Sequence, residues 1–93
     1  MTQDFLYASL SSIRKECLNS FSEWAVPTGD EVKIALRLSG LTAESFSNLI
    51  GVEGRTVRRW TCDEVSIPYV SWCILCLEAG ASKFWGKSDN IIR

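Results

Sequence analysis

Apolar residues recur at helical spacing along most of this chain, and the pattern predicts an all-α fold. The N-terminal stretch, from Asp4 to about Ser22, places its apolar side chains in steps of three or four residues, so that they form one stripe. The stripe consists of Leu6, Leu10, Ile13, Cys17, Phe21 and Trp24. We therefore expect an amphipathic helix within residues 1–24, whose stripe either packs on the rest of the protein or supports a dimer.

Helix boundary signals mark further helices in residues 28–80, which form the predicted domain. Thr28, followed three residues later by Glu31, is typical of a capping box, and Gly40 ends the helix that starts there. The stretch Tyr69–Ala79 predicts a helix that is apolar on nearly every side. Such a helix must be covered on every side, by the other helices or by a second subunit.

The stretch Thr42–Trp60 predicts two short helices joined by a tight turn. Thr42 is an N-cap residue type, and Gly51 ends the first helix, as glycine does where the backbone becomes left-handed. The second helix is expected from about Gly54 to about Cys62.

A helical wheel at about 100° per residue divides the second of these helices into an apolar and a basic side. Val57, Trp60 and Glu53 lie on one side, and Val57 and Trp60 are assigned to the core. Arg55, Arg58 and Arg59 lie together on the other side. Because like charges on one helix face repel each other, this block indicates an anionic partner. The alternative is the solvated face of an ordinary helix.

The segment Gly40–Pro68 resembles the Cro/repressor-type helix-turn-helix family, also called XRE-like or lambda-repressor-like. The matching residues are Gly40-Leu41-Thr42, Phe46, Leu49-Ile50-Gly51-Val52, Arg55-Thr56-Val57-Arg58-Arg59-Trp60 and Ile67-Pro68. With its flanking helices the match spans about residues 30–80. The resemblance implies a compact domain of four to five helices that binds DNA sequence-specifically, as in the transcriptional regulators of phages and plasmids.

Two positions depart from the family pattern. The family's glutamine after the threonine, a DNA contact, is Ala43 here, so one expected contact is absent. The glutamate and glycine turn that usually follow the tryptophan are replaced by Thr61-Cys62-Asp63-Glu64. We expect Asp63 and Glu64 to be solvated loop acids.

The basic helix face and the resemblance together indicate the DNA contacts. Arginine pairs bidentately with O6 and N7 of guanine, or it positions a domain by contacting phosphate. Free N–H groups at a helix N-terminus favour phosphate as well. The expected main contacts are Arg55, Arg58 and Arg59, and the expected phosphate contacts are Thr42, Ser45 and Thr56.

The charge balance limits how DNA is bound. The 93 residues carry a formal net charge of −1, so the chain is not a basic nucleic-acid coat. Binding must use a local patch and depend on geometry and dimerisation. The length corresponds to one domain, followed by a C-terminal extension over residues 81–93.

Neither a metal site nor catalytic residues are evident in the sequence. Cys73 and Cys76 form a CxxC pair, but zinc needs four ligands, and the chain contains no histidine and no second CxxC. The four cysteines are therefore expected to pack as free thiols, with no cofactor and no small-molecule ligand. Without histidine or a glycine-rich phosphate loop, an enzyme is not expected. The absence of a signal-peptide pattern and of an apolar run of ~18 residues predicts a cytoplasmic protein without membrane contact.

The sequence thus predicts a transcriptional regulator, specifically a homodimeric repressor that binds double-stranded DNA at a near-palindromic operator. The alternative is a protein-binding adaptor that retains the helix-turn-helix fold without binding DNA, because fold alone does not determine function. The acidic balance and the bulky apolar helix Tyr69–Leu77 favour this alternative.

Overall fold

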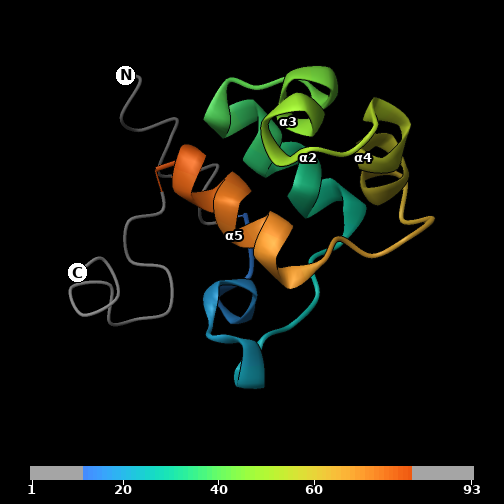
Figure 1. Cartoon of the computed structure of the whole chain (residues 1–93). Coiled ribbons are helices and arrows are strands. Elements are labelled where there is room, and N and C mark those ends of the chain that lie inside the picture. Colours follow the sequence, from blue (N-terminus) through green and yellow to red (C-terminus); the bar gives the residue numbers. More distant parts are fainter. Residues whose placement is uncertain (1–11, 81–93) are drawn as a thin grey trace.

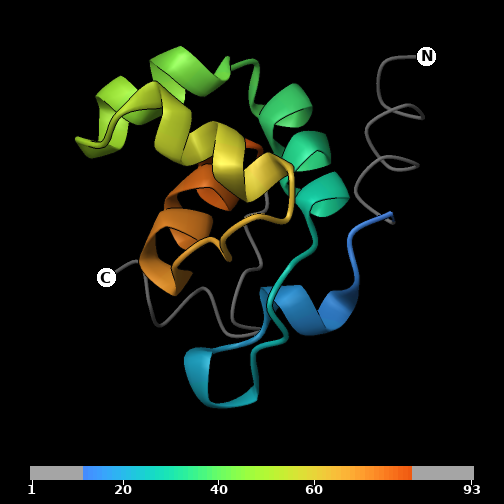
Figure 2. The ribbon, with the colours of Figure 1, turned by 90° about the vertical axis from the view of Figure 1, so that its right-hand side faces the viewer.

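The computed structural model describes residues 12–80. Two short 3₁₀-helices are followed by four α-helices: η1 (Lys15–Leu18), η2 (Phe21–Glu23), α2 (Gly29–Ser39), α3 (Ala43–Ile50), α4 (Gly54–Thr61) and α5 (Tyr69–Glu78). These described residues contain no β-strand, and the predicted all-α fold is confirmed. In both ribbon views α3 and α4 lie toward one end of the domain and the blue segment with η1 and η2 lies at the other, with α5 between them (Figure 1 and Figure 2). Helix α2 lies beside α4 (Figure 2).

The N-terminal segment differs from the predicted amphipathic helix. Arg14 and Asn19, which flank η1, have extended backbone with ψ angles of 141° and 166°, so no continuous α-helix runs from residue 12 to residue 24. The prediction of one helix through this part is therefore wrong. The earlier part of that prediction, residues 1–11, and the C-terminal extension 81–93 lie outside the described residues.

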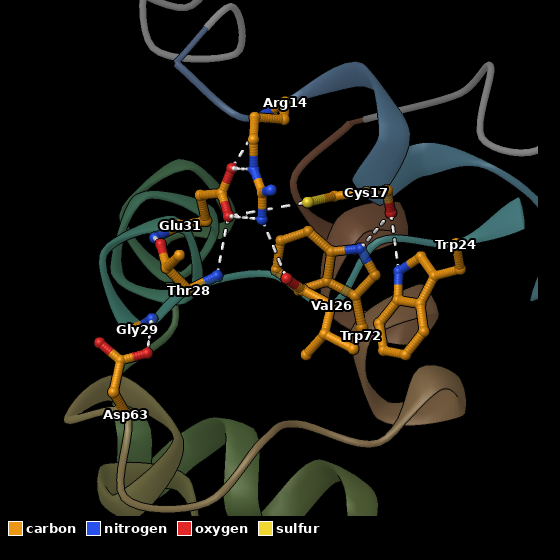
Figure 3. A network of polar contacts seen from close by, with 9 residues as sticks. All are labelled: Arg14, Cys17, Trp24, Val26, Thr28, Gly29, Glu31, Asp63 and Trp72. Atoms are coloured by element: carbon orange, nitrogen blue, oxygen red, sulfur yellow. Dashed lines mark hydrogen bonds and ion pairs between the residues drawn. The ribbon is translucent and has the colours of Figure 1, made fainter.

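Contacts with α5 explain why this segment does not form an α-helix. The carbonyl oxygen of Cys17 accepts hydrogen bonds from two indole N–H groups, that of Trp24 at 3.0 Å and that of Trp72 at 2.7 Å (Figure 3). The carbonyl oxygen of Asn19 accepts from the Tyr69 hydroxyl at 3.0 Å. Carbonyl groups that would bond within a helix are instead satisfied by side chains from α5 and from the segment itself. The segment therefore packs on α5.

An ion pair between the half-exposed Arg14 and the buried Glu31 joins the same segment to α2. Glu31 is only 5% exposed, and its carboxylate accepts from Arg14 Nε at 2.9 Å and from Arg14 Nη2 at 3.0 Å (Figure 3). The backbone N–H groups of Arg14 and Thr28 donate to the same carboxylate at 3.0 and 2.7 Å. Burial by itself raises the pKa of Glu31, but the hydrogen bonds from Arg14 and Thr28 outweigh it and lower the pKa to about 2. The carboxylate is therefore held charged.

The predicted boundaries of α2 and α3 agree with the observed ones. Thr28 and Glu31 form a complete capping box at the start of α2, and Gly40 ends this helix with a φ of 77°. Thr42 caps α3 through the backbone N–H of its third residue, and Gly51 ends that helix with a φ of 81°. At both ends a left-handed backbone is required, which glycine adopts without steric cost.

Side chains from η1 and all four α-helices meet in one core. Phe46 and Trp72 are completely buried, and Trp60 is 4% exposed. Val57 is completely buried too, which confirms that Val57 and Trp60 face inward from α4. The other buried apolar residues are Ile13, Cys17, Val32, Ala35, Leu36, Ile67, Cys73, Leu75 and Cys76. Burial of each large apolar side chain contributes about 1.5–3 kcal/mol, so this core is the main stabilising element.

The turn after α4 holds that helix against the start of α2. Asp63 has a φ of 63°, an unusual conformation for a residue other than glycine, and its Oδ1 accepts a hydrogen bond from the Gly29 N–H at 2.7 Å. A Cβ atom at Gly29 would overlap the carbonyl oxygen of Thr61. Asp63 is thus a structural acceptor rather than only a solvated acid, and Gly29 permits the close approach of α4 to α2.

Within residues 12–80, no helix combines the length and apolarity that crossing a membrane would require.

Candidate nucleic-acid interface

The candidate interface is built on α3 and α4, which are joined by the turn that follows Ile50. The N–H groups of Gly51 and Val52 both donate to the carbonyl of Ser47, at 2.8 and 3.0 Å. The rings of Phe46 on α3 and Trp60 on α4 pack edge to face, with centroids 6.5 Å apart. The turn and the ring contact together fix the angle between α3 and α4. The outer face of α4 therefore stays exposed.

The outer face of α4 carries the three predicted arginines. The side chains of Arg55, Arg58 and Arg59 are 75%, 60% and 55% exposed, whereas Val57 and Trp60 are buried on the opposite face. The wheel therefore assigned these five side chains to the correct sides. An exposed row of guanidinium groups on a well-packed helix has the chemistry needed to contact phosphates and guanine edges.

Each of these arginines has a carboxylate close by. The three nitrogen–oxygen distances are 3.4 Å for Arg55 Nε–Glu53 Oε1, 3.9 Å for Arg58 Nη1–Glu44 Oε1 and 3.9 Å for Arg59 Nε–Glu64 Oε1. All six side chains are more than half exposed, so each pair is weak and solvent-screened. The basic face is consequently accompanied by an equal number of acidic groups.

Sequence reasoning missed these three pairings. It also placed Glu53 on the side of Val57 and Trp60, which is wrong, because the Glu53 side chain is 78% exposed and lies beside Arg55. Glu53 and Arg55 are two residues apart, Arg59 and Glu64 are five apart, and Glu44 lies on a different helix from its partner. None of these spacings is the three- or four-residue step that predicts an ion pair along a helix. The expectation that Glu64 is only a solvated acid is incomplete, since its carboxylate lies beside Arg59.

The hydroxyl residues predicted to contact phosphate lie at the N-termini of the two helices. Thr42 and Ser45 are exposed, and their side chains form the capping box of α3, with Ser45 N–H donating to Thr42 Oγ1 at 3.0 Å. Thr56 is half-buried in the first turn of α4. Glu44, between the first two, reaches Arg58, so the start of α3 adjoins the basic face of α4.

The cysteines lie apart from this chemistry. Cys17, Cys73 and Cys76 are buried and Cys62 is exposed, and no disulfide joins any of these four residues. Burial raises the pKa of the Cys17 thiol to about 11 and raises that of Cys76 as well. The thiols of Cys17 and Cys76 therefore remain protonated, and Cys17 Sγ donates to Glu31 Oε1 at 3.6 Å. Cys73 and Cys76 lie among the apolar side chains of the core. No cluster of three or more potential metal ligands occurs among the described residues.

Fold and surface together define a small all-helical domain with a helix-turn-helix pair and an exposed basic helix. Its sequence is 41% identical over 78 residues to the transcriptional repressor protein KorC of Escherichia coli, an alignment that covers 81% of this chain and 92% of that protein. A second KorC from Escherichia coli is 42% identical over 77 residues, covering 80% and 91% of the two chains. The chain therefore belongs to the KorC family of transcriptional repressor proteins. No family model matches the chain, and no solved structure matches it.

Proposed function

We propose that this protein is a transcriptional repressor of the Cro/repressor type that binds DNA sequence-specifically through α4. The observation that carries the proposal is the two-sided construction of α4, with Val57 and Trp60 buried and Arg55, Arg58 and Arg59 exposed on the other face. The family name of the relatives supports the repressor role. In this role the protein acts in the cytoplasm and has no catalytic activity.

The proposed binding mode places α4 in the major groove of double-stranded DNA. Its exposed arginines reach either guanine O6 and N7, which reads sequence, or the flanking phosphates, which positions the domain. The starts of α3 and α4 then face the DNA backbone, where Thr42, Ser45 and Thr56 contact phosphates through hydroxyl or backbone N–H groups. Helix α3 crosses the backbone, as the first helix of such a pair does.

We also propose that the repressor is a homodimer whose interface lies on α5. Val70 and Leu77 on this helix are 68% and 44% exposed, and Ile74 between them is half-buried, so the three side chains form one apolar stripe. An apolar stripe on a helix of a small domain is a typical association site. A two-fold symmetric dimer places its recognition helices about 34 Å apart, which requires a near-palindromic operator.

The test is binding of the purified protein to duplex DNA from the region upstream of its own gene, measured at several salt concentrations. A repressor of this kind retards the upstream fragment far more strongly than a scrambled duplex of equal length, and its affinity falls as salt rises. Failure to bind either duplex at low salt would overturn the proposal. That result would favour the protein-binding adaptor as the alternative function.

A further inference from the structure

No structural role, such as helix capping, accounts for all three carboxylates that lie beside the arginines of α4. Glu53 precedes α4 and makes no capping hydrogen bond with its side chain, and Glu64 lies in the turn after the helix. Glu44 belongs to α3, and its carboxylate reaches Arg58 on α4. The same carboxylate occupies the space that a side chain at Gly54 would fill. Three carboxylates from three different segments thus converge on the same row of guanidinium groups.

A carboxylate and a DNA phosphate compete for the same guanidinium hydrogen bonds, because both are anions that accept from its planar fork. An exposed ion pair contributes only about 0.2–1 kcal/mol, so DNA displaces it where many contacts form at once. In a loosely placed, sequence-independent complex the arginines gain little by exchanging carboxylate for phosphate. In a complex with the correct sequence they gain bidentate bonds to guanine.

We infer that Glu44, Glu53 and Glu64 act as intramolecular competitors of DNA phosphate and determine specificity by suppressing sequence-independent binding. This inference rests on the proposed DNA-binding function of α4. It assigns the three glutamates a role in discrimination between DNA sequences, whereas the arginines supply the contacts. It also accounts for a DNA-binding face in a chain of net charge −1, since most of the attraction to arbitrary DNA is cancelled locally.

The test uses the full-length variant E44Q/E53Q/E64Q, which removes the three charges and retains side chains of the same size. The control is E16Q/E23Q/E78Q, which changes the net charge equally. Glu16, Glu23 and Glu78 are exposed, lie on η1, η2 and α5, and take part in none of the ion pairs within residues 12–80. The segment with η1 and η2 is at the far end of the domain from α4 (Figure 2).

Two duplexes serve as probes: a site selected from a random duplex library with the parent protein, and a scrambled duplex of equal length and composition. We expect the triple variant to bind the scrambled duplex about tenfold or more tightly than the parent does, with a logarithmic salt dependence steeper by about 0.9 for each freed arginine. Affinity for the selected site rises less, so the ratio of the two affinities falls. The control triple variant retains the parent's ratio and slope.

Three results would overturn the inference in distinguishable ways. If the parent binds no DNA, the proposed function fails and this inference fails with it. If the parent binds its selected site but the triple variant discriminates as well as the parent, only the inference fails. If both triple variants lose discrimination equally, net charge rather than local competition is responsible. If circular dichroism shows that the triple variant does not fold, the single variant Glu64→Gln is used instead, because Glu64 lies outside the helices. The inference is then tested by the salt dependence of its binding to the scrambled duplex.

Discussion

Asp63, directly beyond the C-terminal end of α4, accepts a 2.7 Å hydrogen bond from the backbone N–H of Gly29, the first residue of α2. The two residues are 34 positions apart in the chain. The bond satisfies an N–H group at the start of α2 that has no partner within the helix, and it places a negative charge at the positive end of the helix dipole. It therefore determines how the proposed recognition helix is mounted on the domain.

Replacement of Asp63 separates its two roles. Asp63→Gly retains a residue suited to a φ of 63° but removes the acceptor, and we expect it to lower the free energy of unfolding by about 0.5–2 kcal/mol. Asp63→Asn retains both an acceptor and tolerance of this backbone conformation, so it should cost less. Urea unfolding of both variants and the parent measures the difference. Equal stability of the glycine variant and the parent would contradict the assignment.

Two glycines at helix starts should differ in how strongly replacement by alanine destabilises the protein. In Gly29→Ala the new Cβ meets the rigid backbone carbonyl of Thr61, so we expect a loss of about 1–3 kcal/mol in the free energy of unfolding. In the matched control, Gly54→Ala, the new Cβ meets the flexible carboxylate of Glu44, which moves aside at little cost. Thermal unfolding of the two variants checks the contrast, and a more destabilising control would refute it.

The ion pair of the buried Glu31 with the half-exposed Arg14 predicts acid sensitivity. The pKa of Glu31 lies below its ordinary value of 4.5, at about 2 in the folded protein, so folding favours the charged carboxylate. Its contribution to stability is complete above about pH 4.5 and is lost as the pH falls toward 2, because the unfolded chain then binds more protons than the folded one. Urea unfolding from pH 5 to pH 2 should show a steeper loss for the parent than for Glu31→Gln. Parallel pH profiles would show that the carboxylate is not stabilised.

Arg58 is expected to act in binding and not in folding. Its side chain is 60% exposed, and its ion pair with Glu44 is weak. Arg58→Ala should weaken binding to the selected DNA site by about 1–3 kcal/mol. The melting temperature should stay close to that of the parent. Lys33→Ala, an exposed basic residue on α2, is the control for net charge. Equal DNA affinity of Arg58→Ala and the parent, measured by fluorescence anisotropy, would remove Arg58 from the interface.

The exposed stripe on α5 should control assembly. Substitution of Val70 and Leu77 by lysine places two charges on this face, and neither side chain is part of the buried core. We expect the double variant to be a folded monomer with weak DNA binding, whereas the parent is a dimer. Light scattering at tens of micromolar distinguishes the two states. A parent that is monomeric with and without DNA would exclude the proposed dimer.

The sequence alone determined those features that depend on near neighbours. The capping pair of Thr28 and Glu31, the stops at Gly40 and Gly51, and the limits of α3 and α4 follow from local backbone chemistry, and the structure has them as expected. The two faces of α4 follow from helical periodicity. This local information also supported the resemblance to a repressor family, which the relatives confirm in its broader form.

Only the tertiary structure decided features that depend on residues far apart in the chain. The apolar spacing of the N-terminal segment matches that of an α-helix, yet two 3₁₀-helices form within residues 12–24. The reason is that side chains of α5 donate hydrogen bonds to the carbonyl groups of Cys17 and Asn19. The pair of Glu31 with Arg14 spans 17 residues, and the bond from Gly29 to Asp63 spans 34. No periodicity encodes such contacts, because they arise only where separate helices pack together. For the same reason the basic face of α4 was predictable from the sequence, whereas the carboxylate that α3 brings to it was not.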